Sequence, residues 1–206
     1  MIRLPAGIVS SDGRICNLDD GPLVLSPTTQ PDHPLTLPDF ETTVTQHQHR
    51  VLGYAARLLG DAEQAADVVQ DAMLKLWRHR DTVDSEGAVS WLLRVTHNAC
   101  IDALRRRKLE RGIFNAEADA ELISGDGIGP DRAAESADLR GHLERALQRL
   151  AEPYRSIVIL REVEDFRYDE ICGALDLPMT TVKVYLHRGR HMLRKIIEEA
   201  FQHELI

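Results

Sequence analysis

Basic side chains that could neutralise DNA phosphates gather near the end of a chain that is otherwise acidic. The 206 residues carry a formal net charge of −8, yet residues 177–197 include no Asp or Glu. Just before them, residues 168–176 have the pattern of a short helix and a tight turn, which predicts a helix-turn-helix with a basic second helix. Such a helix fits the major groove of DNA. The side chains predicted to face DNA are Thr181, Lys183, Val184, His187, Arg188 and Arg190.

These six side chains could act in two ways that the sequence does not separate. Arg and Lys pair with guanine edges, which gives sequence preference, or neutralise phosphates, which does not. The alternative to DNA binding is a solvated basic face on a helix that buries Val182, Leu186 and Leu193 in a core.

A second basic cluster closes a helix predicted over residues 87–108. The cluster consists of Arg105, Arg106, Arg107 and Lys108, and phosphate contacts explain it most simply. Asn98 and Asp102 lie on the same helix. From the residues alone, Asn98 could be an ordinary exposed residue, and Asp102 could pair with Arg105 or Arg106, three and four residues on.

An acidic face marks the helix predicted from the N-cap Asp61 to about His79. Its members, spaced three or four residues apart, are Glu63, Asp67, Gln70 and Asp71. Taken alone, this face could simply be solvated. Beside two basic clusters, it indicates a basic partner in addition to DNA.

Composition and spacing argue against an enzyme. The chain has no nucleophile–base set, no glycine loop that would cradle a phosphate and no carboxylate pair in an apolar setting, so no cofactor is expected. His187 and His191 are four residues apart, but a third metal ligand is missing, so no metal is expected.

The cysteines, in three separate segments, predict reduced thiols. No apolar run approaches the ~20 residues of a membrane span, so we expect a cytoplasmic protein without membrane insertion.

The periodicity predicts an all-α protein with two small helical domains on a flexible acidic linker. We expect a Pro-rich extension over residues 1–38, a first domain over 39–110 that begins with Asp39 as N-cap, a linker over 111–137 and a second domain over 138–206. Pro153 suits the first turn of a helix. One hypothesis for the extension is that it folds over a basic face and damps activity; a tail without a role is the alternative.

Three blocks of sequence resemble the extracytoplasmic-function (ECF) group of bacterial RNA polymerase sigma factors. Residues 61–77 resemble the polymerase-binding helix of region two, and residues 90–108 resemble the helix that melts and reads the −10 element. Residues 150–155, residues 160–162 and the helix-turn-helix resemble region four, which reads the −35 element. The blocks occur in the family's order. Cys172, Asp176, Thr180 and Val184 depart from the usual residues, and Asp176 should tolerate the left-handed backbone of a turn.

The resemblance implies partners and roles. The acidic face would dock on the β′ clamp helices of core RNA polymerase, and the β flap would be a second contact. Asn98 would lie near a pocket for a flipped base of the melted strand. An anti-sigma factor is a further expected partner. The alternative function is a conventional helix-turn-helix regulator that binds an operator alone as a dimer.

Overall fold

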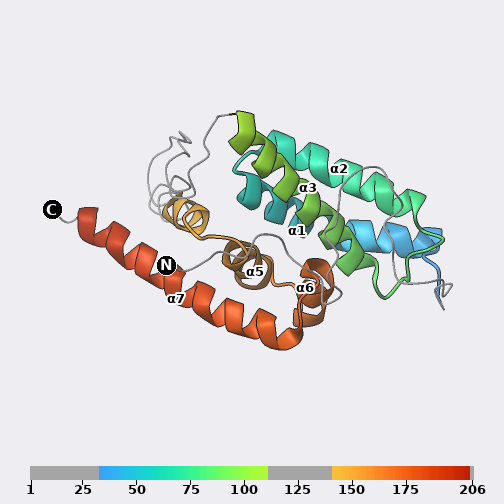
Figure 1. The fold of residues 1–206 in the computed structure, drawn as a ribbon. Coiled ribbons are helices and arrows are strands. Elements are labelled where there is room, and N and C mark those ends of the chain that lie inside the picture. The colour runs from blue at the N-terminus through green and yellow to red at the C-terminus, as the bar shows by residue number, and fades with distance from the viewer. Residues whose placement is uncertain (1–32, 111–140, 205–206) are drawn as a thin grey trace, which may run out of the picture. The chain divides into compact units, whose positions relative to one another are not determined.

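The computed structural model describes residues 33–110 and 141–204, the last four by backbone alone, and in these ranges the chain is helical (Figure 1). The described residues contain no strand, only an isolated bridge between Pro34 and Asp84. The predicted all-α class is confirmed. None of the helices in these ranges is long and apolar enough to cross a membrane.

Helix α1 (Leu37–Leu59) starts three residues ahead of the position that the sequence suggested. Thr36, not Asp39, is the N-cap: its hydroxyl accepts the Asp39 amide, and the Asp39 carboxylate accepts the Thr36 amide at 3.1 Å. The Thr36 hydroxyl also donates to the Asp39 carboxylate at 2.5 Å, and this hydrogen bond, with the one from the Thr36 amide, lowers the pKa of Asp39. The prediction of Asp39 as N-cap was therefore wrong, because Asp39 is the other half of a capping box. Gly60 ends the helix at φ 65°, as expected of a left-handed cap.

Helices α2 (Ala62–Arg78) and α3 (Ala88–Glu110) complete the N-terminal part. Asp61 caps α2 as predicted, accepting the Gln64 amide at 3.0 Å. On α3 the buried residues are Ala88, Leu92, Leu93, Thr96, Cys100 and Ala103, whereas Trp91 and Ile101 are partly exposed. The buried face is wide because α3 packs against α1, α2 and α6.

The C-terminal part is built from helical residues 141–148, α5 (Tyr154–Val158), a π-helical turn η1 (Ile159–Val163), α6 (Tyr168–Leu175) and α7 (Met179–Glu204). Pro153 lies at the N-cap of α5, one residue before the predicted first turn. Asp176 ends α6 at φ 53°, so its left-handed backbone is confirmed. Val182 and Leu186 are buried as predicted, and Leu193 is half-buried.

The buried side chains of both parts belong to one core cluster. α6 lies against α3, and η1 touches α1. The core also reaches ahead of α1, since Leu35 is buried and its amide is 3.1 Å from the carbonyl oxygens of Arg80 and Val83. The packed structure thus begins before residue 39.

Candidate nucleic-acid interface

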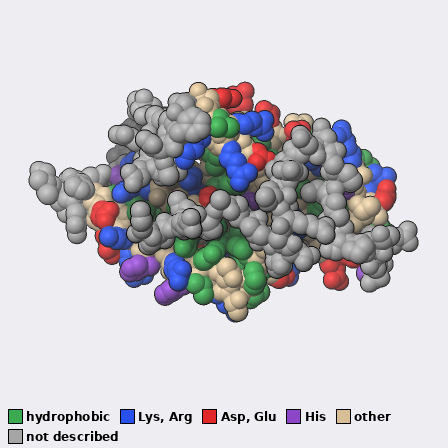
Figure 2. Space-filling view, in the orientation of Figure 1, with side chains coloured by type: hydrophobic (Ala, Val, Ile, Leu, Met, Phe, Trp, Pro, Cys, Tyr) green, Lys and Arg blue, Asp and Glu red, His purple; other side chains and the backbone are tan. Residues whose placement is uncertain are grey.

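Helix α7 presents the predicted DNA-facing side chains on the side opposite its core contacts. Lys183, Val184, His187, Arg188 and Arg190 are exposed, and Thr181 is half-buried. Figure 2 shows Lys, Arg and His side chains along the lower left, where Figure 1 places α7. Gly189 faces inward, where an added Cβ would lie 2.7 Å from Cγ2 of Val158. A glycine at this position therefore lets α7 approach α5 closely.

Two side chains of this face are oriented by neighbouring elements. Arg190 donates from Nη2 to Oε1 of Glu162 at 2.6 Å, and this hydrogen bond raises the pKa of Arg190. The ammonium of Lys183 lies 5.9 Å from the ring centroid of Tyr168. Two positive charges of α7 thus lie against Glu162 of η1 and Tyr168 of α6.

Helix α3 brings together the second set of predicted side chains. Asn98, Arg105 and Arg106 are exposed. Asp102 lies 3.4 Å from Nη1 of Arg105, which is the local pairing that the sequence left open. This pairing does not remove Arg105 from solvent, since its side chain is 67% exposed.

Arg107, by contrast, is engaged within the protein. It donates to the carbonyl oxygen of Leu59 at 2.8 Å and to the Asp61 carboxylate at 2.9 Å. These bonds join the end of α3 to the turn between α1 and α2. Lys108 is half-buried.

The acidic face of α2 is exposed at all of its predicted residues: Glu63, Asp67, Gln70 and Asp71. Leu74 extends the same face and is 46% exposed, which sequence reasoning missed. The missed signal is an apolar residue three positions after Asp71. The face borders a groove of about 320 Å³ between α2 and α3, lined by Gln64, whose buried Oε1 has no hydrogen-bond partner among the described residues.

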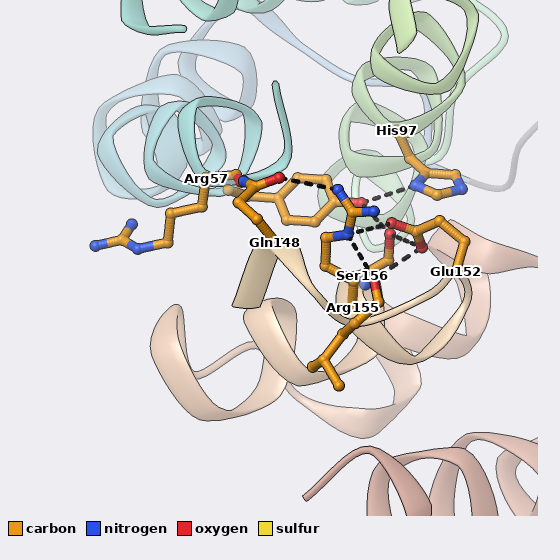
Figure 3. A network of polar contacts seen from close by, with 8 residues as sticks. Arg57, His97, Gln148, Glu152, Arg155 and Ser156 are labelled. Atoms are coloured by element: carbon orange, nitrogen blue, oxygen red, sulfur yellow. Dashed lines mark hydrogen bonds and ion pairs between the residues drawn. The ribbon is translucent and has the colours of Figure 1, made fainter. Parts of the chain in front are cut away.

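A polar network joins α1 and α3 to α5 and to Glu152 just before it, and is buried at Tyr54 and Ser156 and half-buried at His97 and Glu152 (Figure 3). The Tyr54 hydroxyl lies 2.7 Å from Nδ1 of His97 and 3.2 Å from Oγ of Ser156, and Ser156 donates to the Glu152 carboxylate at 2.6 Å. Each hydroxyl has one hydrogen. With Glu152 ionised, the Ser156 hydroxyl donates its hydrogen bond to Glu152, and the Tyr54 hydroxyl donates to Ser156. His97 must then donate from Nδ1 to the Tyr54 oxygen.

Burial sets the protonation of this network. It lowers the pKa of His97 to about 4, with a smaller contribution from Arg105. It raises the pKa of Glu152, against the hydrogen bonds from Ser156 and the charge of Arg155. It also raises the pKa of Tyr54. His97 is therefore neutral near pH 7. No sequence motif pointed to this network, because its members are as much as 102 residues apart.

Within the described ranges, no three His, Cys, Asp or Glu side chains are grouped as metal ligands. Cys100 is buried, which raises the pKa of its thiol to about 12.

Comparison with known proteins agrees with this arrangement. The Sigma-70 region 2 model matches residues 43–110, and the Sigma-70, region 4 model matches residues 140–193. The ECF RNA polymerase sigma factor SigW of Bacillus subtilis is 29% identical over 147 residues, 68% of this chain and 79% of the relative. The RNA polymerase sigma-H factor of Pseudomonas aeruginosa is 30% identical over 146 residues, 67% of this chain and 75% of the relative.

Two solved structures share the fold. The sigma factor RpoE of Bartonella quintana, solved with the anti-sigma factor NepR, aligns with a TM-score of 0.60 at 23% identity, covering 79% of this chain and 98% of that one. CnrH, solved with the cytosolic domain of CnrY, aligns with a TM-score of 0.57 at 21% identity, covering 78% and 88%.

Proposed function

This chain belongs to the ECF group of RNA polymerase sigma factors, and we propose which of its surfaces bind core polymerase and the two promoter elements. Members of the family act as transcription-initiation factors. The observation that carries the proposal is the presence of separate exposed faces, acidic on α2 and basic on α3 and α7.

The acidic face of α2 docks on the β′ clamp helices of core polymerase. Its carboxylates supply the encounter rate and the register of docking, since charge complementarity acts mainly on these. Leu74 supplies apolar area at the centre of the contact. The C-terminal domain makes a second contact with the β flap.

Promoter DNA is held at two places. The domain over residues 39–110 reads the −10 element through α3, with Asn98 and Asp102 near a base that has left the stack and the basic cluster on phosphates. The domain over residues 138–206 reads the −35 element through the exposed face of α7. The factor does no covalent chemistry; it shifts the equilibrium toward opened DNA by binding that state more tightly.

The protein acts in the cytoplasm, where core polymerase and promoter DNA are found, and an anti-sigma factor holds it inactive. The solved relatives with NepR and CnrY support this last partner. The alternative of a dimeric operator-binding regulator is not favoured, because both family models match in the order of a sigma factor.

Mobility shifts and in vitro transcription with and without core polymerase test the proposal. The free protein should bind promoter DNA weakly, and core polymerase should make binding specific and start transcription. Nanomolar, specific binding by the free protein would support the regulator instead.

A further inference from the structure

Val184 is an apolar side chain on the outer side of α7. Val182 is fully buried and Leu186 is 1% exposed, whereas Val184, which lies between them in the chain, is 46% exposed. Because a helix turns once in about 3.6 residues, Val184 lies on the side opposite these two core residues. Among the described residues of α7, those that pack partly against the core are Tyr185, Leu193 and Ile196. Packing in the described core therefore does not account for a valine at position 184.

The neighbours of Val184 on the helix surface are polar or basic. Residues three and four positions apart are neighbours on a helix, and Thr180, His187 and Arg188 stand at these distances, all of them exposed. A single exposed apolar residue is ordinary on a protein surface and by itself indicates no function. Val184 differs because it lies within a basic face, since residues 177–197 include no Asp or Glu.

The position of Val184 along α7 determines what it can reach in DNA. α7 begins at Met179, so Val184 lies in the second turn of the second helix of the helix-turn-helix. In this motif the N-terminal residues of the second helix contact base edges in the major groove. The basic side chains around Val184 can bind phosphates, which position the helix without reading sequence. Valine has no group that binds a phosphate, so its contact in the groove is a base edge.

The chemistry of the valine side chain favours one kind of base edge. The side chain neither donates nor accepts hydrogen bonds, so against guanine, adenine or cytosine it would displace water from polar atoms without replacing the lost hydrogen bonds. Thymine presents a methyl group in the major groove, and apolar side chains pack against it. Valine is also held mostly in one rotamer within a helix, so its methyl groups lose little freedom when they meet a base.

We propose that Val184 reads the C5-methyl group of a thymine in the −35 element. The inference rests on the proposed sigma function and deepens it, because it names the base that one residue of the DNA-facing side selects. It concerns this chain in particular, since Val184 is one of the positions at which the helix-turn-helix departs from the residues usual in the family. The basic residues around Val184 supply affinity, and Val184 supplies a preference for thymine.

Deoxyuridine tests the proposal, because it differs from thymidine only in lacking the C5-methyl group. A promoter is first selected from a random library by core polymerase with the full-length chain. Each thymine on either strand of its −35 element is then replaced singly by uracil, and competition mobility shifts at one fixed salt concentration give the ratio of the two affinities. At one thymine, wild type should bind the uracil form about fourfold more weakly. This factor is equivalent to about 0.8 kcal/mol for one buried methyl group, at ~1.4 kcal/mol per factor of ten.

Val184→Ser should lose this discrimination. Serine and valine have similar helix propensities, so α7 should be retained, which circular dichroism checks. The thymine and uracil forms should bind Val184→Ser with equal affinity, whereas Val184→Ile keeps an apolar, β-branched side chain and should keep the preference. Leu109→Ser is the matched control, because it replaces an apolar residue that is 63% exposed on α3 and should leave the ratio of affinities as in wild type.

Two results would overturn the inference. One is a −35 element in which no replacement of thymine by uracil weakens wild-type binding, including an element without thymine. The other is a ratio of affinities that is the same for wild type and Val184→Ser at every position.

Failure of the sigma function would look different, since core polymerase would then not make promoter binding by the chain specific. The chain alone would in that case be taken through the same selection and uracil series, which still decide whether Val184 contacts a thymine. If the chain alone selects no DNA either, both the sigma function and the thymine contact fail.

Discussion

Arg190 on the exposed face of α7 is held at 2.6 Å by Glu162 of the π-helical turn, so the guanidinium that we propose binds DNA is already oriented in the free protein. The pair is half-exposed on both sides, which makes its value for stability small. The pair matters because it orients the Arg190 guanidinium, since Arg reads a base through two hydrogen bonds of defined geometry.

Glu162→Gln should therefore relax the −35 preference at the base pair that Arg190 reads. The loss of one base contact costs about 1–3 kcal/mol of discrimination. A promoter-library selection with holoenzyme gives the measurement. Asp165→Asn is the control, since it removes a carboxylate that pairs with Arg161 instead. Identical sequence logos for wild type, Glu162→Gln and Arg190→Ala would exclude base reading by Arg190.

Asn98→Ala should impair promoter opening more than polymerase binding. Asn98 is exposed on α3, and its amide is free to read an unstacked base. Permanganate footprinting reports strand opening, and a mobility shift reports core binding. If opening on duplex promoters is unchanged, Asn98 does not belong to the −10 site.

Arg106→Ala and Arg107→Ala should separate phosphate binding from structure. Because Arg106 is exposed, Arg106→Ala should lower the salt slope of promoter binding by about one unit and leave the melting temperature unchanged. Arg107→Ala should lower the free energy of unfolding by on the order of 1 kcal/mol, because the Leu59 carbonyl and Asp61 lose a charged donor. Salt titrations and thermal melts measure both. The reverse assignment of effects would contradict this division.

His97→Gln should flatten the pH dependence of stability between about pH 6.5 and 4. The pKa of His97 is about 4 in the folded chain against 6.5 in the unfolded one, so its contribution is intact above pH 6.5 and is lost as pH falls toward 4. The loss in wild type is on the order of 1–3 kcal/mol. Glu152 acts in the opposite direction, since its pKa is raised and its protonation favours the folded state.

Urea unfolding at a series of pH values measures this difference. His187→Gln is the control, because His187 is exposed on α7. Parallel stability curves for wild type and His97→Gln would mean that His97 is not held neutral by the fold.

Local rules predicted those features that depend on neighbours in the chain. Asp61 as a cap and Asp176 in a left-handed turn follow from residue type and position alone. The acidic face of α2 and the exposed face of α7 follow from helical spacing. Asp39 was misplaced because Thr36 and Asp39 both suit the start of a helix, and only the reciprocal hydrogen bonds distinguish them.

The contacts between distant segments could not be predicted in this way. Arg107 reads as one more charge in a basic run, and only its distance from Asp61 gives it a structural role. Nothing in the sequence around His97 indicates that it contacts Tyr54, and nothing around Glu164 indicates that it pairs with Arg57. The exposure of Leu74 follows from where α2 meets its neighbours. The predicted role of the extension over residues 1–38 stays a prediction, since residues 1–32 lie outside the described residues.

Leu35 has a mechanical consequence. Its side chain is in the core and its amide faces the carbonyls that end the turn after α2, so the backbone before α1 is fastened at a point next to the entry of α3. A force applied to the N-terminus would therefore be divided between α1 and the turn that feeds α3. Removal of residues 1–36 would also remove the Leu35 contacts. A shortened chain that tests the extension should therefore start near residue 31, so that these contacts are kept.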